Sequence, residues 1–227
     1  AGGDETIHAK RNNSGLLEFC YQRVIMSRLG ELLQMDCEPE EGSPTVSNDE
    51  ELEEKLKSWV SLLKEQAGVA LQISPSREEP YKNIYKALEA TIPAQKKMVS
   101  VLKSYEGSPV LRFRLEFAII HATSSLAKWY EICEEYGISE KYHKQCLGII
   151  ENALTNSKDD VEEEIQGGVR RCHFMHIYEH IRFAIVCSER DKQHEALELL
   201  MKAEELYHQF KTEETSVSLE HYPILGI

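Results

Sequence analysis

The residues best suited to chemistry lie between positions 169 and 188, where a line of histidines crosses an otherwise apolar stretch. His176 and His180 are one helical turn apart, and Cys172 precedes them by one further turn. Imidazole and thiolate groups at this spacing are ligands that zinc accepts on a helix. However, Ile177 stands where a metalloprotease helix carries its glutamate general base. Cys172, His176 and His180 are therefore candidate metal ligands, for a metal-binding protein or for a hydrolase.

The alternative interpretation of these histidines is structural. Polar side chains inside a helical protein commonly form hydrogen bonds across helix interfaces, and Glu179 and Arg182 have the i, i+3 spacing of an ion pair. The chain also has no Gly-x-Ser-x-Gly elbow, no glycine-rich phosphate loop and no cysteine in a protease motif. We favour the structural interpretation, which predicts no catalytic residue, no bound metal and no cofactor.

The helix that must position these histidines is apolar on nearly all sides. Its two apolar faces are Cys172, Met175, Phe183, Val186 and Cys187, and Phe174, Ile177, Tyr178, Ile181 and Ile185. A helix of this kind belongs inside a protein, with other helices packed on both sides. The sequence therefore predicts a structural core at Phe174, Ile177, Tyr178, Ile181 and Phe183. Ile177→Asp or Phe183→Asp is expected to abolish soluble expression, because either would bury an unpaired charge.

The composition narrows the class of protein. The chain has 227 residues, a formal net charge of −13 and 41% hydrophobic residues, which is typical of a folded acidic protein. This acidity argues against nucleic acid and against an anionic membrane as partners. No segment approaches the roughly 18 uninterrupted apolar residues of a membrane span. Six scattered cysteines favour a reducing compartment, so we expect an intracellular protein of the cytoplasm or nucleus.

Helical periodicity dominates the remaining sequence and predicts an all-α fold of seven to eight mostly antiparallel helices. The expected helices cover approximately 14–36, 48–67, 76–92, 94–105, 108–136, 139–156, 157–166, 169–188 and 191–210, with the breaks at Pro93 and Gly167-Gly168 deciding how many are separate. Gly68 and Gly137 are expected to end helices, and Asp191 to cap one.

These helices are expected to form a single domain over residues 14–211. Residues 1–13 are expected to be disordered or a cloning remnant, 37–47 a mobile acidic loop, and 212–227 an irregular tail. The helical hairpins 110–154 and 169–210 align weakly at an offset of 51 residues. This favours stacked helical hairpins, an α-solenoid or a TPR- or HEAT-like array with irregular repeats.

The function expected from these features is a protein-protein interaction module, a helical scaffold or adaptor subunit of a larger complex. Its partner would be a helix or an extended peptide in a groove. Ser43 and Ser74 precede prolines in expected loops and are candidate phosphorylation sites for its regulation. A further alternative is a pocket for an apolar small molecule, lined by Phe113, Phe117, Trp129 and Phe174.

Overall fold

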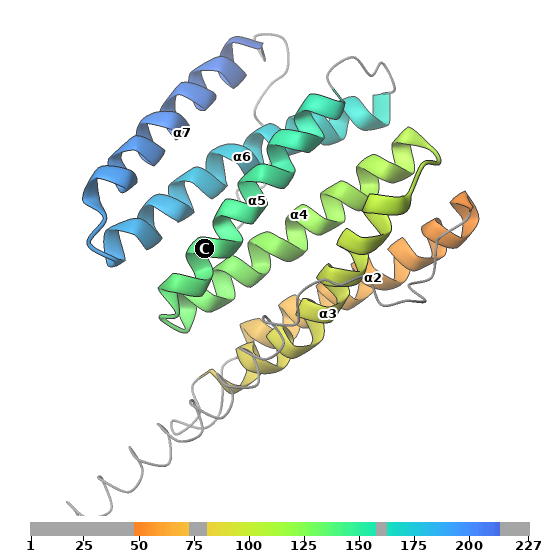
Figure 1. The fold of residues 1–227 in the computed structure, drawn as a ribbon, viewed down its shortest axis with the longest axis horizontal. Helices are drawn as coiled ribbons and strands as arrows, with labels where there is room; N and C mark the ends of the chain where they lie inside the picture. The colour runs from red at the N-terminus through yellow and green to blue at the C-terminus, as the bar shows by residue number, and fades with distance from the viewer. Residues whose placement is uncertain (1–47, 73–80, 158–162, 214–227) are drawn as a thin grey trace, which may run out of the picture. The chain divides into compact units, whose positions relative to one another are not determined.

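The protein is all-helical in the parts that the computed structural model describes, which are residues 48–72, 81–157 and 163–213 (Figure 1). These residues form six helices and no strand. The helices are α2 (Asp49–Leu71), α3 (Lys82–Ser104), α4 (Pro109–Ile132), α5 (Tyr136–Asn156), α6 (Glu163–Glu189) and α7 (Gln193–Glu213). None of them is long and apolar enough to cross a membrane. The predicted helix 14–36, the acidic loop 37–47 and almost all of the tail 212–227 lie outside the described residues.

The chain divides into two compact units, residues 1–129 and 130–227, with the boundary inside α4. Because α4 contributes to both units, the expected single domain over 14–211 stays a prediction. Each unit is described by itself below.

Within the described ranges, fewer helices form than the glycines and prolines of the sequence suggest. α3 continues through Pro93, with Ile92 and Ala94 buried on either side of it, and α6 continues through Gly167-Gly168. α2 passes Gly68 and ends at Leu71. The helix end predicted at Gly68 and the break predicted at Gly167-Gly168 are wrong, because an interior glycine costs only about 1 kcal/mol. At Pro93 the sequence predicts a break or a kink, and the break does not occur because burial of the flanking apolar residues outweighs the proline.

In the first unit, Asp49 joins the start of α2 to the turn between α3 and α4. Asn48 caps α2 by accepting a hydrogen bond from the backbone N–H of Glu51 at 2.8 Å, as the sequence predicts. The Asp49 carboxylate accepts a 2.5 Å hydrogen bond from the buried Tyr105 hydroxyl. Burial and this hydrogen bond raise the pKa of Tyr105 to about 12. A Cβ at Gly107 would overlap the Asp49 carboxylate and the Tyr105 ring, so a larger residue there would displace these two side chains.

In the second unit, two helix ends have the same backbone geometry. Glu134 after α4 and Asp191 after α6 adopt left-handed conformations, with φ of 61° and 58°. The following residues donate backbone hydrogen bonds five residues back, Glu135 to Tyr130 and Lys192 to Cys187, each at 2.9 Å. This is the Schellman motif. Asp191 therefore ends α6 rather than capping α7, and Gly137 lies in the first turn of α5 rather than after α4.

These matching turns relate the start of α5 to the start of α7. Glu134 and Asp191 are 57 residues apart, as are Tyr136 and Gln193, the first residues of α5 and α7. The predicted offset of 51 is therefore wrong by six residues. The predicted offset came from a weak match of residue types. The two left-handed turns instead show which positions of α5 and α7 correspond.

The core of the second unit lies where α5 and α7 pack against α6 (Figure 1). One buried cluster joins all three helices through Leu147 of α5, Phe183, Ala184 and Cys187 of α6, and Ala196 of α7. Tyr142 of α5 stacks on Tyr130 at the end of α4, with ring centroids 5.5 Å apart. α6 is therefore the middle helix of a three-helix layer.

Candidate functional site

The predicted structural core of α6 is buried on one side only. Phe183 is buried, Ile177 and Tyr178 are half-buried, but Phe174 and Ile181 are exposed by 45% and 40%. The prediction that Phe174 and Ile181 are core residues is wrong for the described structure, in which α5 and α7 cover the opposite face of α6. Phe113, Phe117 and Trp129 lie in the first unit and Phe174 in the second, so the alternative of an aromatic pocket stays a prediction.

The three histidines of α6 do not share one environment. His173 is half-buried, whereas His176 and His180 are both buried, with their rings edge to face at a centroid distance of 4.8 Å. His180 Nδ1 lies 2.9 Å from the backbone oxygen of His176, and a hydrogen bond there fixes the His180 ring within its own helix.

The candidate ligands Cys172, His176 and His180 do not assemble into a metal centre in the described part of the chain. Cys172 is fully buried, and no three His, Cys, Asp or Glu side chains of the described residues come together in a way that could hold an ion. Among the described residues, α5 and α7 therefore add no further ligand to the three candidates on α6.

His176 is the side chain of this group that lacks a hydrogen bond. Neither ring nitrogen has a hydrogen-bond partner, although the residue is only 6% exposed. The Glu151 carboxylate of α5 lies 3.6 Å from Nε2, which is too long for a hydrogen bond. Burial, together with electrostatic repulsion from His180, His173 and Lys202, lowers the pKa of His176 to about 4. At neutral pH this ring is therefore uncharged, and its contact with Glu151 is not an ion pair.

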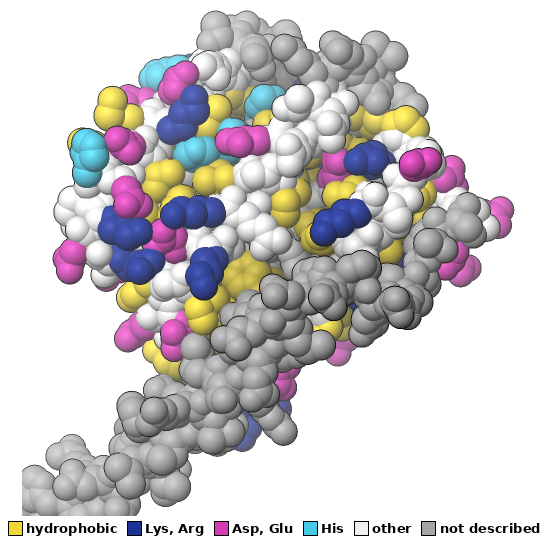
Figure 2. Space-filling view, in the orientation of Figure 1, with side chains coloured by type: hydrophobic (Ala, Val, Ile, Leu, Met, Phe, Trp, Pro, Cys, Tyr) yellow, Lys and Arg dark blue, Asp and Glu magenta, His cyan; other side chains and the backbone are white. Residues whose placement is uncertain are grey.

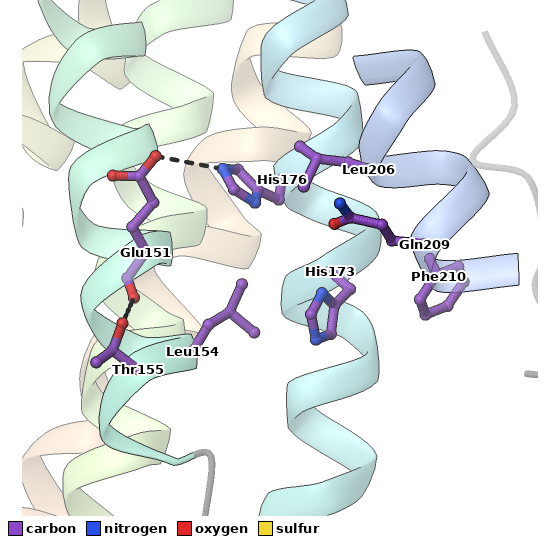
Figure 3. A pocket seen from close by; sticks show the side chains of 8 residues that line it. All are labelled: Glu151, Leu154, Thr155, His173, His176, Leu206, Gln209 and Phe210. Atoms are coloured by element: carbon purple, nitrogen blue, oxygen red, sulfur yellow. Dashed lines mark hydrogen bonds and ion pairs between the residues drawn. The ribbon is translucent and has the colours of Figure 1, made fainter. Parts of the chain in front are cut away.

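A small cavity opens at His176 between α5, α6 and α7 (Figure 3). Its volume is about 240 Å³. The lining residues are Glu151, Leu154, Thr155, His173, His176, Leu206, Gln209 and Phe210. Figure 3 shows Glu151 of α5 and His176 of α6 pointing toward each other, with Gln209 reaching in from α7. The cavity combines an apolar wall with one carboxylate, one hydroxyl, one amide and two imidazole rings.

A buried pair, His143 and Glu179, joins α5 to α6. Glu179 Oε2 lies 2.7 Å from His143 Nδ1, and both side chains are almost completely buried. Since a carboxylate only accepts, Nδ1 donates in this pair. Arg182, the expected partner of Glu179, forms an ion pair with Glu131. No sequence pattern predicts the contact between His143 and Glu179, because the two residues lie 36 positions apart.

Cys146 of α5 is a buried free thiol. Burial, followed by the charge of Glu179 and the neighbouring Cys172, raises the pKa of the Cys146 thiol well above its usual value. A thiol rather than a thiolate is a poor nucleophile. The raised pKa therefore gives no support for Cys146 as a nucleophile.

A second polar cluster surrounds Glu140 at the start of α5. Its buried carboxylate accepts from Lys144 at 2.7 Å and from Lys192 at 2.9 Å, and pairs with Arg190. Burial alone would raise the pKa of Glu140, but the hydrogen bonds from Lys144 and Lys192 outweigh it and hold the pKa at about 2. This cluster ties α5 to the turn between α6 and α7.

Glu140→Gln is expected to lower the free energy of unfolding by about 1–3 kcal/mol at pH 7. Folding lowers the carboxyl pKa from 4.5 to about 2, so its contribution is complete above pH 4.5 and is lost as the pH falls toward 2. Urea unfolding at pH 7 and pH 3, followed by far-UV circular dichroism, should show the difference between wild type and variant narrowing at pH 3. Glu198→Gln, which changes an exposed pair with His194, should show almost no difference at either pH. A gap that stays constant with pH would contradict this assignment.

One face of α7 is apolar and exposed, although the equivalent face of α5 is buried. In α5, Glu140, His143, Leu147 and Ile150 are buried, and at least two of them contact α6: His143 through Glu179 and Leu147 through Phe183. At the offset of 57 residues their α7 equivalents are Leu197, Leu200, Glu204 and Tyr207. Leu197, Leu200 and Tyr207 are exposed by 56%, 46% and 44%, and Met201 beside them by 62%. We refer to Leu197, Leu200, Met201, Glu204 and Tyr207 as the open face of α7.

The open face lies within a charged surface. Figure 2 shows apolar side chains among acidic, basic and histidine side chains over α6 and α7. Glu198 and Glu205 are exposed beside the open face on α7, and Glu204 lies within it. The open face is therefore apolar, with a border of glutamates that lie beside lysine and histidine side chains.

Comparison with known proteins gives no relative: the chain matches no family model, no curated protein and no solved structure.

Two further predicted sites, Ser43 and Ser74, lie outside the described residues, so their phosphorylation stays a prediction.

Proposed function

We propose that the chain is a non-enzymatic protein-protein interaction module, a helical scaffold or adaptor whose open face of α7 receives a helix of a partner protein. The observation that carries this proposal is the equivalence of α5 and α7. The same positions that are buried in α5, where α6 packs, are exposed in α7, where no described helix follows. Large apolar side chains at helical spacing on an exposed face are typical of an interaction surface.

A helix fits the open face better than an extended peptide. The structure already shows what covers this pattern of positions, since α6 covers it on α5. From Leu197 to Tyr207 the face spans about 15 Å along α7, at 1.5 Å per residue. An amphipathic helix of about three turns would cover it. In this proposal the partner helix extends an array of stacked hairpins by one layer.

The charge of the chain favours a basic partner. A second copy of the chain would bring another net charge of −13 to a chain that already carries −13. Charge complementarity speeds association and excludes like-charged partners. We therefore expect a partner helix with lysine or arginine beside its apolar stripe. Function in an intracellular complex, with regulation at Ser43 and Ser74, belongs to the same proposal.

Leu197→Glu combined with Leu200→Glu tests the proposal. Both side chains are exposed, so the variant should fold with an unchanged urea midpoint but bind its partner at least about 100-fold more weakly. Partners are identified by mass spectrometry after affinity purification from lysate, then purified and titrated by calorimetry against wild type and variant. Crosslinking must place a basic helix of the partner on α7.

The matched control is Ile181→Glu with Ile185→Glu, which makes the same change on the exposed side of α6. This control should keep the partner. Partner binding that survives the α7 change, or that is lost equally with the α6 change, would remove the open face as the binding site. Self-association of the wild type that the α7 change abolishes would identify a second copy as the occupant and contradict a basic partner.

A further inference from the structure

The cavity beside His176 places a buried imidazole without a hydrogen-bond partner next to an exposed carboxylate. Glu151 Oε1 and His176 Nε2 face each other at 3.6 Å, and neither ring nitrogen of His176 has a hydrogen-bond partner. Gln209 donates its amide to Glu205 at 3.0 Å, which leaves its carbonyl oxygen as an acceptor. A neutral His176 ring has one N–H and one acceptor nitrogen, and with the hydrogen on Nδ1 its Nε2 is a buried acceptor without a donor. Such an acceptor costs about 1–3 kcal/mol, so this tautomer favours a ligand that supplies N–H groups.

The charge in the cavity selects the sign of the ligand. Glu151 is the ionisable carboxylate of the lining, and its side chain is 62% exposed at the mouth. His176 is uncharged at neutral pH, and the nearby Lys202 is paired with Glu205 at 2.8 Å. An anion would meet the Glu151 carboxylate without a compensating cation, whereas a cation would gain a charged acceptor.

The size and walls of the cavity select the shape of the ligand. Leu154, Leu206 and Phe210 supply an apolar wall. A volume of about 240 Å³ lies below the roughly 300–1,000 Å³ of most small-molecule sites. An aliphatic chain that ends in a cationic nitrogen matches both features, because its methylene groups contact the wall while its N–H groups reach the acceptors.

We infer that the cavity between α5, α6 and α7 binds an alkylammonium or alkylguanidinium group, with Glu151 and His176 Nε2 sharing its N–H donors. Lysine and arginine side chains of a polypeptide and free polyamines share this chemistry. An ammonium carries three donors and a guanidinium five, so one group satisfies both acceptors at once. This site is separate from the open face of α7 and stands without it.

The test is a titration of the full, ¹⁵N-labelled chain, followed at the imidazole nitrogens of His176 by nuclear magnetic resonance at pH 7. The probes are the N-acetyl, N-methylamide derivatives of lysine, arginine and norleucine, and free spermidine. Lysine or arginine should shift the His176 signals saturably with a Kd in the millimolar range, as expected for a single side chain. In the bound state Nε2 should resonate as an unprotonated nitrogen. Norleucine, which has the same stem without the charge, should leave the signals unchanged.

Two variants separate the site from general acidity. Glu151→Gln keeps the shape of an exposed side chain and should weaken binding about tenfold. Glu198→Gln removes an equally exposed charge outside the cavity and should leave binding unchanged. Spermidine that binds more than tenfold tighter than the lysine derivative would identify free polyamines as the source, and weaker binding would identify a polypeptide side chain. The inference is overturned by absent saturation at tens of millimolar, by equal binding of norleucine, or by an unchanged affinity in Glu151→Gln.

Discussion

Glu179→Ala is expected to lower the free energy of unfolding of the second unit by about 3–5 kcal/mol. The Glu179 carboxylate accepts a 2.7 Å hydrogen bond from His143, and both side chains are buried between α5 and α6. Removing the carboxylate leaves the His143 Nδ1–H without a partner and opens a cavity at the helix interface. Typical domains are stable by only 5–15 kcal/mol, so the change should make this unit marginal.

The paired replacement distinguishes a polar pair from mere packing. His143→Leu alone should be about as destabilising as Glu179→Ala, because it leaves a buried carboxylate with one partner fewer. His143→Leu combined with Glu179→Leu fills the interface with apolar groups and should recover most of the loss. Far-UV circular dichroism in urea measures the total, and hydrogen exchange of α5 and α6 peptides assigns it to the second unit. If the losses of unfolding free energy in the two single variants simply added in the double variant, the two residues would not act as a pair.

The helices were predictable because their apolar residues repeat with the helical period over several turns. The ends were less predictable, because helix ends depend on energies near 1 kcal/mol that tertiary packing overrides. Gly68, Pro93 and Gly167 all have strong local preferences, yet α2, α3 and α6 pass through them. In contrast, the left-handed turns use Glu134 and Asp191, where no glycine marks them.

The candidate site was less predictable than the fold, because it depends on pairs of residues far apart in the chain. Helical spacing correctly brought His176 and His180 together, since neighbours one turn apart always meet. It gave no information on Glu151 of α5, which lies 3.6 Å from His176, or on His143 beside Glu179. Those contacts depend on how α5 is rotated against α6. An apolar pattern alone does not encode that rotation.

The two faces of α6 show the same limit. The sequence correctly identified a helix that is apolar nearly all round, but periodicity reports hydrophobicity and not the number of neighbours. In the described structure α5 and α7 cover the face that contains Cys172, Phe183 and Cys187, and leave Phe174 and Ile181 exposed. Apolar residues on the second face are therefore no proof of burial within the chain. This distinction changes what two aspartate substitutions on α6 should do.

Phe183→Asp is expected to prevent folding of the second unit, whereas Ile177→Asp is expected to leave a soluble protein. Phe183 is buried in the cluster that joins α5, α6 and α7, and its ring stacks on His143 with centroids 5.9 Å apart. Removing a buried phenylalanine costs about 3–5 kcal/mol, and an unpaired carboxylate in its place costs several more. Lys144 lies 5.6 Å from the ring centroid, but Glu140 already holds its ammonium at 2.7 Å.

Ile177 is only half-buried, so an aspartate there keeps its charge in contact with water, and the expected loss is about 1–2 kcal/mol. Soluble yield, circular dichroism and hydrogen exchange of α6 should therefore rank the variants in the order Ile185→Asp, Ile177→Asp and Phe183→Asp, from least to most damaged. Ile185 is the matched control, since it is exposed on the same helix two positions from Phe183. Phe183→Leu separates charge from volume and should cost less than about 1.5 kcal/mol. If Ile177→Asp proved as damaging as Phe183→Asp, the second face of α6 would be buried in the folded protein, and the exposure assigned to it would be wrong.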